Sequence, residues 1–301
     1  MNLLITGAYP VTPAKIAEFE NAGYCVDIQK DERARTATPE KYGAVICNAL
    51  FQYNDMESFT SLSVIQLTSV GRDRIPEKYA AARGIAVYNA GDAYCRPMAE
   101  WAVFGILSIY KNARFLFENY GKWRKSRTVF ELCGKHVAVF GFGNAGRETA
   151  KRLRGFDCRI TAVDVREIAS PYADGFVPVS QADRLLPETD ILVIAMPLTR
   201  ETEHYFGAER LSLLKDGAVV VNIARGGLID ENALIAELQS CRLLGAALDV
   251  FETEPLPADS PLYSMKNVYV SPHNSFIGEN NRERLDGIVR KNLLNGGDRN
   301  A

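Results

Sequence analysis

The sequence has no hydrophobic run long enough to cross a membrane. A membrane-spanning helix needs about 20 consecutive apolar residues, and no stretch of the 301 residues reaches that length. The first residues, MNLLITG, contain no basic region, and their apolar run is too short for a signal peptide. We therefore expect a cytoplasmic protein that does not bind membranes.

The six cysteines form no disulfide framework and no metal-binding motif. No C-x-x-C pair is present, and the cysteines are scattered at positions 25, 47, 95, 133, 158 and 241. Such a pattern is typical of reduced core thiols in a cytosolic protein. A chain of this length buries about 75% of the surface of its unfolded form, so it needs neither a disulfide nor a metal to fold. We expect no bound metal.

A large excess of charge of one sign is also missing. The chain has 35 Lys and Arg residues against 37 Asp and Glu residues, which gives a formal net charge of −2. The two signs are interspersed, and there is no basic stripe of the kind that nucleic-acid binding requires. We therefore expect no nucleic-acid partner.

The most informative stretch that is present covers residues 136–164. Residues 137–140 are apolar and indicate a short buried strand. The sequence GFGNAG follows at 141–146, then a helical pattern and a second strand that ends at Asp164. In such a G-x-G-x-x-G loop the first glycine permits a tight turn, the second lets the backbone approach a pyrophosphate, and the third lets the helix pack close to the strand.

This stretch predicts a dinucleotide-binding site. Free N–H groups at the helix start would face the phosphates, and Asp164, 18 residues after Gly146, could accept both ribose hydroxyls. A glycine-rich turn without a ligand, or the similar loop of a methyltransferase, explains the glycines but not their combination with both strands and the Asp. Asp164 favours NAD over NADP, because a 2′-phosphate would meet its negative charge, although Arg166 could soften that preference.

Strands and helices are predicted to alternate along the chain, which is typical of parallel α/β sheets. In the first part, strands are predicted over 2–6, 24–28, 44–47, 64–68 and 85–88, with helices over 13–21, 55–59 and 76–83. In the second part, strands are predicted over 137–140, 159–163, 191–195, 218–222, 244–248 and 268–270, with helices over 208–214, 230–240 and 276–294. The tail at 295–298 is expected to fray.

One long helix is predicted over 97–120. It is apolar over most of its first half, and its aromatic residues are Trp101, Phe104, Tyr110, Phe115, Phe117 and Tyr120. A central core helix or a connector between domains is the simplest explanation. Because these aromatics exceed what one small core needs, we expect the helix also to pack against a second subunit in a homodimer.

Polar residues follow three of the predicted strands in the second part, namely Arg225, Glu254 and His273. In open α/β sheets, ligands bind beyond the carboxyl ends of the strands. An Arg can bind a carboxylate by two parallel hydrogen bonds, a His can exchange a proton near neutral pH, and a neighbouring Glu favours the protonated imidazole. Each residue alone has an ordinary structural explanation, but together the three form a coherent set on one rim.

The chain resembles the D-isomer-specific 2-hydroxyacid dehydrogenases, including phosphoglycerate dehydrogenase. The matching segments of the second part are GFGNAG with Asp164, MPLTRETEHYF, GAVVVNIARGGLIDENAL, GAALDVFETEP and SPHNS. The first part matches through QLTSVGRDRIP, GIAVYNA and PMAEWAV. The segments occur in the family's order, with 29 residues from Arg225 to Glu254 and 19 more to His273.

The resemblance implies two doubly wound parallel-sheet domains. A Rossmann NAD-binding domain, residues 96–274, would be inserted into a flavodoxin-like substrate domain, residues 1–95 plus 275–301. It also implies an NAD-dependent oxidoreductase that interconverts a small 2-keto acid and a D-2-hydroxy acid. The alternative on the same fold is an NAD(H)-sensing, non-catalytic corepressor or scaffold of the C-terminal binding protein type.

The resemblance also implies roles for individual residues. Arg225 would bind the substrate carboxylate and polarise the keto oxygen, His273 would give that oxygen a proton as hydride arrives, and Glu254 would pair with His273. The expected cofactor-binding residues are Gly141, Gly143, Asn144, Ala145, Gly146, Asp164, Pro197, Thr202, Ile223, Ala224 and Asp249. The expected substrate-binding residues are Asn48, Arg72 and, through their backbone N–H groups, Val70 and Gly71.

Arg72 stands where the family usually has a small or aliphatic residue. It is either a solvent-facing charge or a contact for a second anion on the substrate, such as a phosphate. Glyoxylate, hydroxypyruvate, pyruvate, branched 2-keto acids and 3-phosphohydroxypyruvate all fit the expected carboxylate clamp, so the sequence leaves the substrate open.

Overall fold

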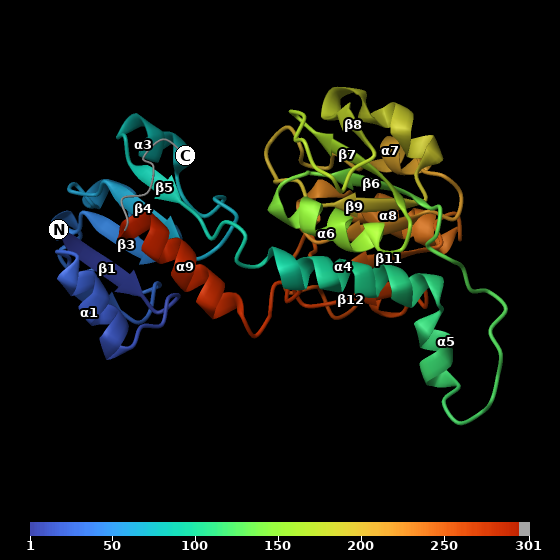
Figure 1. Cartoon of the computed structure of the whole chain (residues 1–301), viewed down its shortest axis with the longest axis horizontal. Helices are drawn as coiled ribbons and strands as arrows, with labels where there is room; N and C mark the ends of the chain where they lie inside the picture. The colour runs from blue at the N-terminus through green and yellow to red at the C-terminus, as the bar shows by residue number, and fades with distance from the viewer. Residues whose placement is uncertain (295–301) are drawn as a thin grey trace. The chain divides into compact units, whose positions relative to one another are not determined.

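The structure is a computed structural model that describes residues 1–294, and these divide into two compact units (Figure 1). Unit 1 comprises residues 1–93 and the C-terminal part from residue 279, and unit 2 comprises residues 94–278. The boundaries expected from the sequence, 95/96 and 274/275, lie two and four residues from these. The tail that was expected to fray, 295–298, lies outside the described residues.

Unit 1 contains a five-stranded parallel sheet in the order β2-β1-β3-β4-β5. This is the flavodoxin-like order, in which ligands bind near the point where the strand order reverses. The strands are β1 Asn2–Thr6, β2 Cys25–Gln29, β3 Ala44–Cys47, β4 Val64–Leu67 and β5 Ala86–Tyr88. The helices are α1 Pro13–Asn21, α2 Leu50–Tyr53, α3 Glu77–Ala82 and α9 Asn281–Leu293, with 3-10 segments at Pro39–Lys41 and Met56–Ser58.

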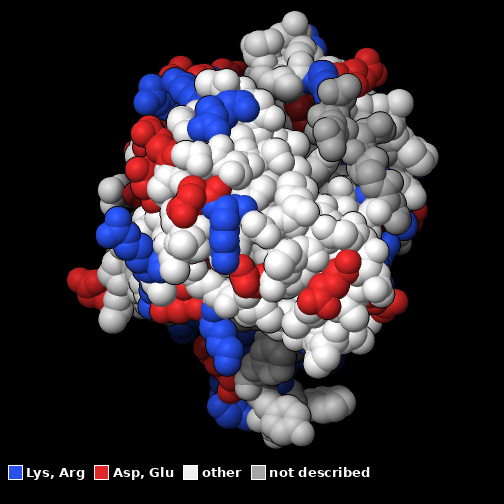
Figure 2. Space-filling model, turned by 90° about the vertical axis from the view of Figure 1, so that its left-hand side faces the viewer, with Lys and Arg blue, Asp and Glu red and all other residues white. Residues whose placement is uncertain are grey.

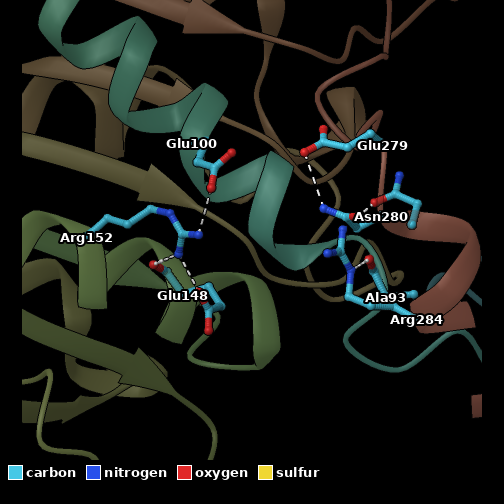
Figure 3. Close-up of polar contacts among 8 residues, drawn as sticks. Ala93, Glu100, Glu148, Arg152, Glu279, Asn280 and Arg284 are labelled. Atoms are coloured by element: carbon cyan, nitrogen blue, oxygen red, sulfur yellow. Dashed lines mark hydrogen bonds and ion pairs between the residues drawn. The ribbon is translucent and has the colours of Figure 1, made fainter. Parts of the chain in front are cut away.

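The C-terminal helix α9 belongs to unit 1 although it follows unit 2 in sequence. Arg290 of α9 donates from Nε and Nη2 to the Glu18 carboxylate of α1, both at 2.9 Å. Arg284 donates from Nε to the Ala93 carbonyl at 2.7 Å (Figure 3). Unit 1 is therefore built from both ends of the chain.

Unit 2 contains a seven-stranded parallel sheet in the order β12-β11-β10-β9-β6-β7-β8. The strands are β6 His136–Phe140, β7 Arg159–Asp164, β8 Gly175–Pro178, β9 Ile191–Ile194, β10 Val219–Asn222, β11 Gly245–Leu248 and β12 Val268–Val270. The helices are α4 Cys95–Tyr110, α5 Ala113–Glu118, α6 Asn144–Arg154, α7 Ala208–Leu213 and α8 Glu231–Gln239, with 3-10 segments at Val179–Glu188, Gly226–Leu228 and Pro261–Tyr263. The order reverses between β6 and β9, as in a Rossmann fold.

The two faces of the unit 2 sheet are both covered, which explains why its central strands are mostly apolar. Val137 and Val139 of β6 belong to the core under α4 and α6, whereas Ala138 and Phe140 belong to the core under α7 and α8. This alternation follows from the two-residue period of a strand. The predicted fold class, two doubly wound parallel sheets, is confirmed.

Helices α4 and α6 lie side by side on one face of this sheet (Figure 1). Arg152 of α6 donates to the Glu100 carboxylate of α4 at 3.0 Å and also contacts Glu148 one turn earlier in its own helix (Figure 3). The pairing of α4 with α6 places α4 inside unit 2 as a core helix.

The prediction of one helix over 97–120 is wrong. Helix α4 ends at Tyr110, and α5 begins at Ala113. Between them Asn112 has a φ of 50°, in the left-handed region, which no helix can continue through. Asn is one of the few residues other than glycine that tolerate this conformation, so a helical pattern of apolar residues concealed the break.

Shorter elements also differ from the sequence expectation. The helix expected over 276–294 begins only at Asn281. The helix expected over 55–59 is a 3-10 segment, and α2 lies where the sequence predicts no helix. Strand β8 has the sequence GFVP, which is too short and too rich in Gly and Pro to be recognised from its pattern.

All six cysteines are free, but they do not all lie in the core. Cys47, Cys95 and Cys158 are buried, whereas the other three are exposed, so the expectation of core thiols is wrong for Cys25, Cys133 and Cys241. Cys25 begins the edge strand β2, and the other two lie outside helices and strands.

Surface charge is mixed on the face drawn in Figure 2, where described Lys and Arg side chains alternate with Asp and Glu and leave wide areas of neither. Within residues 1–294, no helix is long and apolar enough to cross a membrane.

Candidate active site

A glycine-rich turn joins β6 to α6 at the carboxyl end of the unit 2 sheet. Gly141 has a φ of 88°, and a Cβ added there would lie 2.4 Å from the Met196 N atom. A Cβ on Gly146 would lie 2.1 Å from the Gly141 carbonyl oxygen. Only glycine therefore fits at either position. At Gly143, in contrast, an added Cβ would meet nothing within 4 Å, so the chain is open towards a ligand there.

This turn leads directly into the first residues of α6, Asn144 and Ala145. The first N–H groups of a helix have no partner within the helix and carry its positive partial charge, so they suit a phosphate. The open approach at Gly143 and the start of the 11-residue helix α6 together fit the pyrophosphate of a dinucleotide.

Asp164 ends β7, the strand beside β6, and its carboxylate lies against the glycine turn. Oδ2 accepts a hydrogen bond from the Phe142 N–H at 2.8 Å, and Oδ1 accepts one from the Val165 N–H at 2.8 Å. The side chain is half-buried, and Arg166 is exposed. The carboxylate is therefore held where a ribose bound to the same turn would meet it.

The turns after β9 and β10 hold the remaining expected cofactor residues. Thr202 donates from Oγ1 to the Pro197 carbonyl oxygen at 2.8 Å, which closes the turn after β9. After β10, Ile223 is buried and Ala224 is half-buried. The Ala224 N–H donates to Oδ1 of Asn222 at 3.0 Å.

His273 and Glu254 form a close pair. The ring atom Nδ1 of His273 lies 2.7 Å from Oε2 of Glu254, and their side chains are 33% and 36% exposed. Glu254 is also held by the Phe251 N–H, which donates to Oε1 at 3.1 Å. The ring atom Nε2 is the second proton-carrying position of His273 and is not used by this pair.

A pocket of about 590 Å³ has both His273 and Glu254 in its wall. The rest of its lining is mostly apolar and includes Phe251, Pro255, Leu256, Tyr263, Val270 and Pro272. Phe276 packs edge-on to the His273 ring, with ring centroids 6.2 Å apart. Among residues 1–294, the imidazole therefore pairs with the Glu254 carboxylate beside a mostly apolar pocket wall.

Arg225 follows β10 and is half-buried in an extended backbone conformation. It donates from Nη1 to the Ala224 carbonyl oxygen at 2.8 Å. Its own carbonyl oxygen accepts a hydrogen bond from Nδ2 of Asn222 at 2.9 Å. Arg225, Glu254 and His273 thus follow three adjacent strands of one sheet, β10, β11 and β12, on its carboxyl edge.

Within unit 1 the expected substrate residues follow the adjacent strands β3 and β4. The Asn48 N–H donates to Oε1 of Glu32 at 2.7 Å. In the loop after β4, Val70 and Arg72 are exposed. Among residues 1–294, the N–H groups of Val70 and Gly71 donate no hydrogen bond.

Comparison with known proteins identifies the family. Residues 107–275 match the model for the NAD binding domain of D-isomer specific 2-hydroxyacid dehydrogenases, which is more than half of the chain. The chain belongs to this family. The predicted resemblance is thereby confirmed, and the protein is a 2-hydroxyacid dehydrogenase that uses a nicotinamide dinucleotide.

Relatives of known function support the assignment. A glyoxylate reductase of Pyrococcus furiosus is 31% identical in an alignment of 311 positions that covers 97% of this chain and 91% of that protein. A hydroxypyruvate reductase of Thermotoga maritima is 37% identical over 253 residues, which cover 82% of this chain and 81% of that protein. The crystal structure of an NADPH-dependent glyoxylate/hydroxypyruvate reductase from Sinorhizobium meliloti, in complex with NADP and malonate, has a TM-score of 0.80 at 26% identity, covering 97% of this chain and 92% of that one.

Two buried residues of this dehydrogenase support the rim and were not recognised as supports from the sequence. Asn222 fixes the turn before Arg225 through both ends of its amide. Asp249 accepts from the Ser271 hydroxyl at 2.6 Å and from the Asn274 N–H at 2.9 Å, and so holds the loop that carries His273. In the sequence, the feature that could have indicated the role of Asn222 is a single amide side chain at the end of an otherwise apolar strand.

The other two histidines lie away from the His273–Glu254 pair. His136 is buried in β6, where its Nε2 lies 2.8 Å from Oγ1 of Thr161. Burial and the nearby Arg159 charge lower the pKa of the His136 ring. His204 pairs with Glu252, with Nε2 and Oε1 2.8 Å apart. Among the residues described, no three His, Cys, Asp or Glu side chains are grouped so that they could hold a metal ion.

Proposed function

We propose that this dehydrogenase reduces a small 2-keto acid to the D-2-hydroxy acid with NADH in the cytoplasm, and catalyses the reverse reaction with NAD. The bound nicotinamide supplies the hydride. His273 supplies the proton, Glu254 orients His273, and Arg225 binds the substrate. The observation that carries the proposal is the 2.7 Å contact between Nδ1 of His273 and Glu254 on the same rim as Arg225.

The proton would be transferred from Nε2 of His273. Because Nδ1 is held by the Glu254 carboxylate, the ring is fixed in the orientation that leaves Nε2 for the substrate. The carboxylate also stabilises the positive charge of the protonated ring. In the reduction, Nε2 gives its proton to the keto oxygen; in the oxidation it takes the hydroxyl proton back.

Arg225 would bind the substrate carboxylate through two parallel N–H···O hydrogen bonds and draw electron density from the keto oxygen. In unit 1, the unpaired N–H groups of Val70 and Gly71 would bind an anionic group. Asn48 and Arg72 would contact the rest of the substrate. The support for the loop is that its two N–H groups have no partner among residues 1–294.

The proposed cofactor is NAD rather than NADP. The support is the Asp164 carboxylate, which two backbone N–H groups hold beside the glycine turn, where a 2′-phosphate would meet its charge. The proposed binding residues are Gly141, Gly143, Asn144, Ala145, Gly146, Asp164, Pro197, Thr202, Ile223, Ala224 and Asp249.

The proposed assembly is a homodimer. Its support is a group of exposed aromatic residues in and after α5, of which Phe117 is 77%, Tyr120 90% and Trp123 95% exposed. Neighbouring aromatic side chains so open to water mark an interaction surface, and a second copy of the chain is the commonest partner of an oligomeric enzyme.

The experiment that tests the function is NADH oxidation against glyoxylate, hydroxypyruvate, pyruvate, branched 2-keto acids and 3-phosphohydroxypyruvate, with wild type and His273→Ala measured side by side. We expect one compound to be reduced by the wild type and at least about 100-fold more slowly by the variant, because general acid catalysis contributes about 10² to 10⁴ in rate. A preference for the phosphorylated compound that Arg72→Leu abolishes would assign Arg72 to a second anion. Bound NADH without turnover of any compound would contradict the proposal and favour the NAD(H)-sensing scaffold.

A further inference from the structure

We infer that Asn89 is a positioning residue for substrate binding. It fixes the backbone of residues 69–71, here called the carboxylate loop, so that the N–H groups of Val70 and Gly71 are presented to an anion. The inference rests on the proposed function for the identity of that anion, the carboxylate of a 2-keto acid.

The carbonyl groups of the carboxylate loop are all hydrogen-bonded. The Ser69 carbonyl oxygen accepts from the Ala90 N–H at 2.9 Å. The Val70 carbonyl oxygen accepts from Nδ2 of Asn89 at 2.8 Å. The Gly71 carbonyl oxygen accepts from the Ser69 hydroxyl at 2.9 Å. The carbonyl groups of three successive residues therefore point towards hydrogen-bond donors of unit 1.

The N–H groups of the same loop are left for a ligand. The C=O and N–H of a trans peptide bond point in opposite directions within one rigid plane. When Asn89 holds the Val70 carbonyl, it therefore turns the Gly71 N–H the opposite way. In the same way, the Ala90 N–H holds the Ser69 carbonyl and so turns the Val70 N–H away from it. Neither N–H donates a hydrogen bond among residues 1–294, and successive free N–H groups form an anion-binding surface.

Asn89 is itself fixed by a buried network. Its Oδ1 accepts from the Gly91 N–H at 3.0 Å, and its carbonyl oxygen accepts from Nε2 of Gln66 at 3.1 Å. Gln66 is fully buried in β4, and its Oε1 accepts from Nδ2 of Asn292 in α9 at 2.8 Å. Each partner restricts the rotation of the next, so the Asn89 amide is held ready before substrate binds.

The asymmetry between donors and acceptors separates this role from ordinary loop stabilisation. Hydrogen bonds that only stabilise a loop would be expected to pair its N–H groups as well as its carbonyl groups. Here every carbonyl is paired and the two adjacent donors are not, although hydrogen bonds satisfy most backbone groups in folded proteins. Donors held in place in advance bind an anion without the cost of ordering them on binding.

The test uses Asn89→Leu, which removes the amide at similar side-chain size. The probe is oxamate, an unreactive compound with a carboxylate next to a carbonyl group, bound to the NADH-loaded enzyme. We expect the oxamate inhibition constant and the KM of the best 2-keto acid to rise about tenfold, which corresponds to about 1.4 kcal/mol. We expect kcat to change much less, because the carboxylate is bound equally in ground and transition states. The Kd of NADH should not change.

Asn2→Leu is the matched control. Asn2 is also half-buried in unit 1 and donates from Nδ2 to a carbonyl oxygen, that of Lys41, at 3.0 Å, but at the amino end of β1. This variant should lose stability as Asn89→Leu does and keep the wild-type oxamate constant. If Asn89→Leu fails to fold, Asn89→Ala replaces it, because it also removes the bond to the Val70 carbonyl; we expect a rise of about the same size in the same constant.

A second measurement separates this inference from the proposed function. In protein labelled with ¹⁵N at Val and Gly, oxamate should shift the amide resonances of Val70 and Gly71 in the wild type and much less in Asn89→Leu. If these shifts depend on Asn89 but no 2-keto acid is reduced, the positioning role stands and the proposed function fails. If 2-keto acids are reduced but the inhibition constant and shifts are the same in Asn89→Leu, the positioning role is overturned. No shift in the wild type overturns it as well.

Discussion

At the scale of single residues, Arg225 provides a direct test of substrate binding. Arg225→Ala should lower kcat/KM at least about 100-fold, because charge-assisted hydrogen bonds contribute about 1.5–3 kcal/mol each and two would be lost. NADH binding should be nearly unchanged in a fluorescence titration. Arg225→Lys keeps the charge but not the two parallel bonds, so it should restore only part of the activity. Full activity of Arg225→Ala would contradict the assigned role.

Asp164 is the residue expected to decide between the two nicotinamide cofactors. Asp164→Asn removes the negative charge and keeps nearly the same side-chain shape. The ratio of kcat/KM for NADH to that for NADPH should fall about tenfold or more, because a 2′-phosphate no longer meets a carboxylate. Steady-state kinetics with both cofactors measures the ratio. An unchanged ratio would show that other groups select the cofactor.

At the scale of elements, the break between α4 and α5 depends on the left-handed conformation of Asn112. Asn112→Gly should be neutral or slightly stabilising, whereas Asn112→Ala should lower the free energy of unfolding by about 1 kcal/mol, because the left-handed region costs residues with a Cβ about 1–2 kcal/mol. Urea denaturation of both variants measures the difference. Equal stability would contradict the conformation of this turn.

The pairing of β6 with β7 should depend on pH through His136. Nη2 of Arg159 lies 2.9 Å from Nδ1 and can only donate to it, which suits the neutral ring. Because burial lowers the pKa of His136 in the folded protein, the unfolded chain binds more protons below the ordinary value of about 6.5. The stabilisation is therefore present above that pH and is lost as the pH falls towards the folded pKa.

The measurement is urea denaturation between pH 5 and 8 for wild type and His136→Gln, with His204→Gln as a control. The loss of unfolding free energy below about pH 6.5 should be smaller in His136→Gln than in wild type, and the control should keep the wild-type slope. Parallel curves for wild type and His136→Gln would show that the buried ring does not contribute.

Elements that depend on local pattern were predictable, and those that depend on one backbone angle were not. The strand at residues 2–6, the helix at 13–21 and the glycine turn follow from periodicity and the glycine spacing, and they occur as expected. The break at Asn112 was missed because the apolar pattern continues through it.

The same distinction applies to the site. The placement of Arg225, Glu254 and His273 on one edge of the sheet could be predicted, because each lies in the loop after a predicted strand; their roles remain predictions. The supporting roles of Asn89 and Asp249 could not, because their hydrogen-bond partners, Val70 and the loop at 271–275, lie about 20 residues or more away in sequence. Such pairings are set by tertiary structure and leave no local pattern.

At the scale of the whole molecule, the exposed aromatics in and after α5 predict a homodimer. Phe117→Asp combined with Trp123→Asp should shift the mass measured by light scattering after gel filtration from two chains to one, because charges in an apolar interface are strongly unfavourable. Tyr53→Asp, at an exposed aromatic of unit 1, is the control and should remain dimeric. A wild type that is monomeric at micromolar concentration would refute the assembly.

The insertion of unit 2 into unit 1 also has a consequence for synthesis on the ribosome. The five strands of unit 1 are translated before unit 2, but α9, whose Arg290 pairs with Glu18 and whose Asn292 bonds to Gln66, is translated after it. Unit 2 emerges as one uninterrupted segment and can fold while the nascent chain is still attached. Unit 1 is complete only once α9 has been made, so we expect its sheet to depend on protection from aggregation until then.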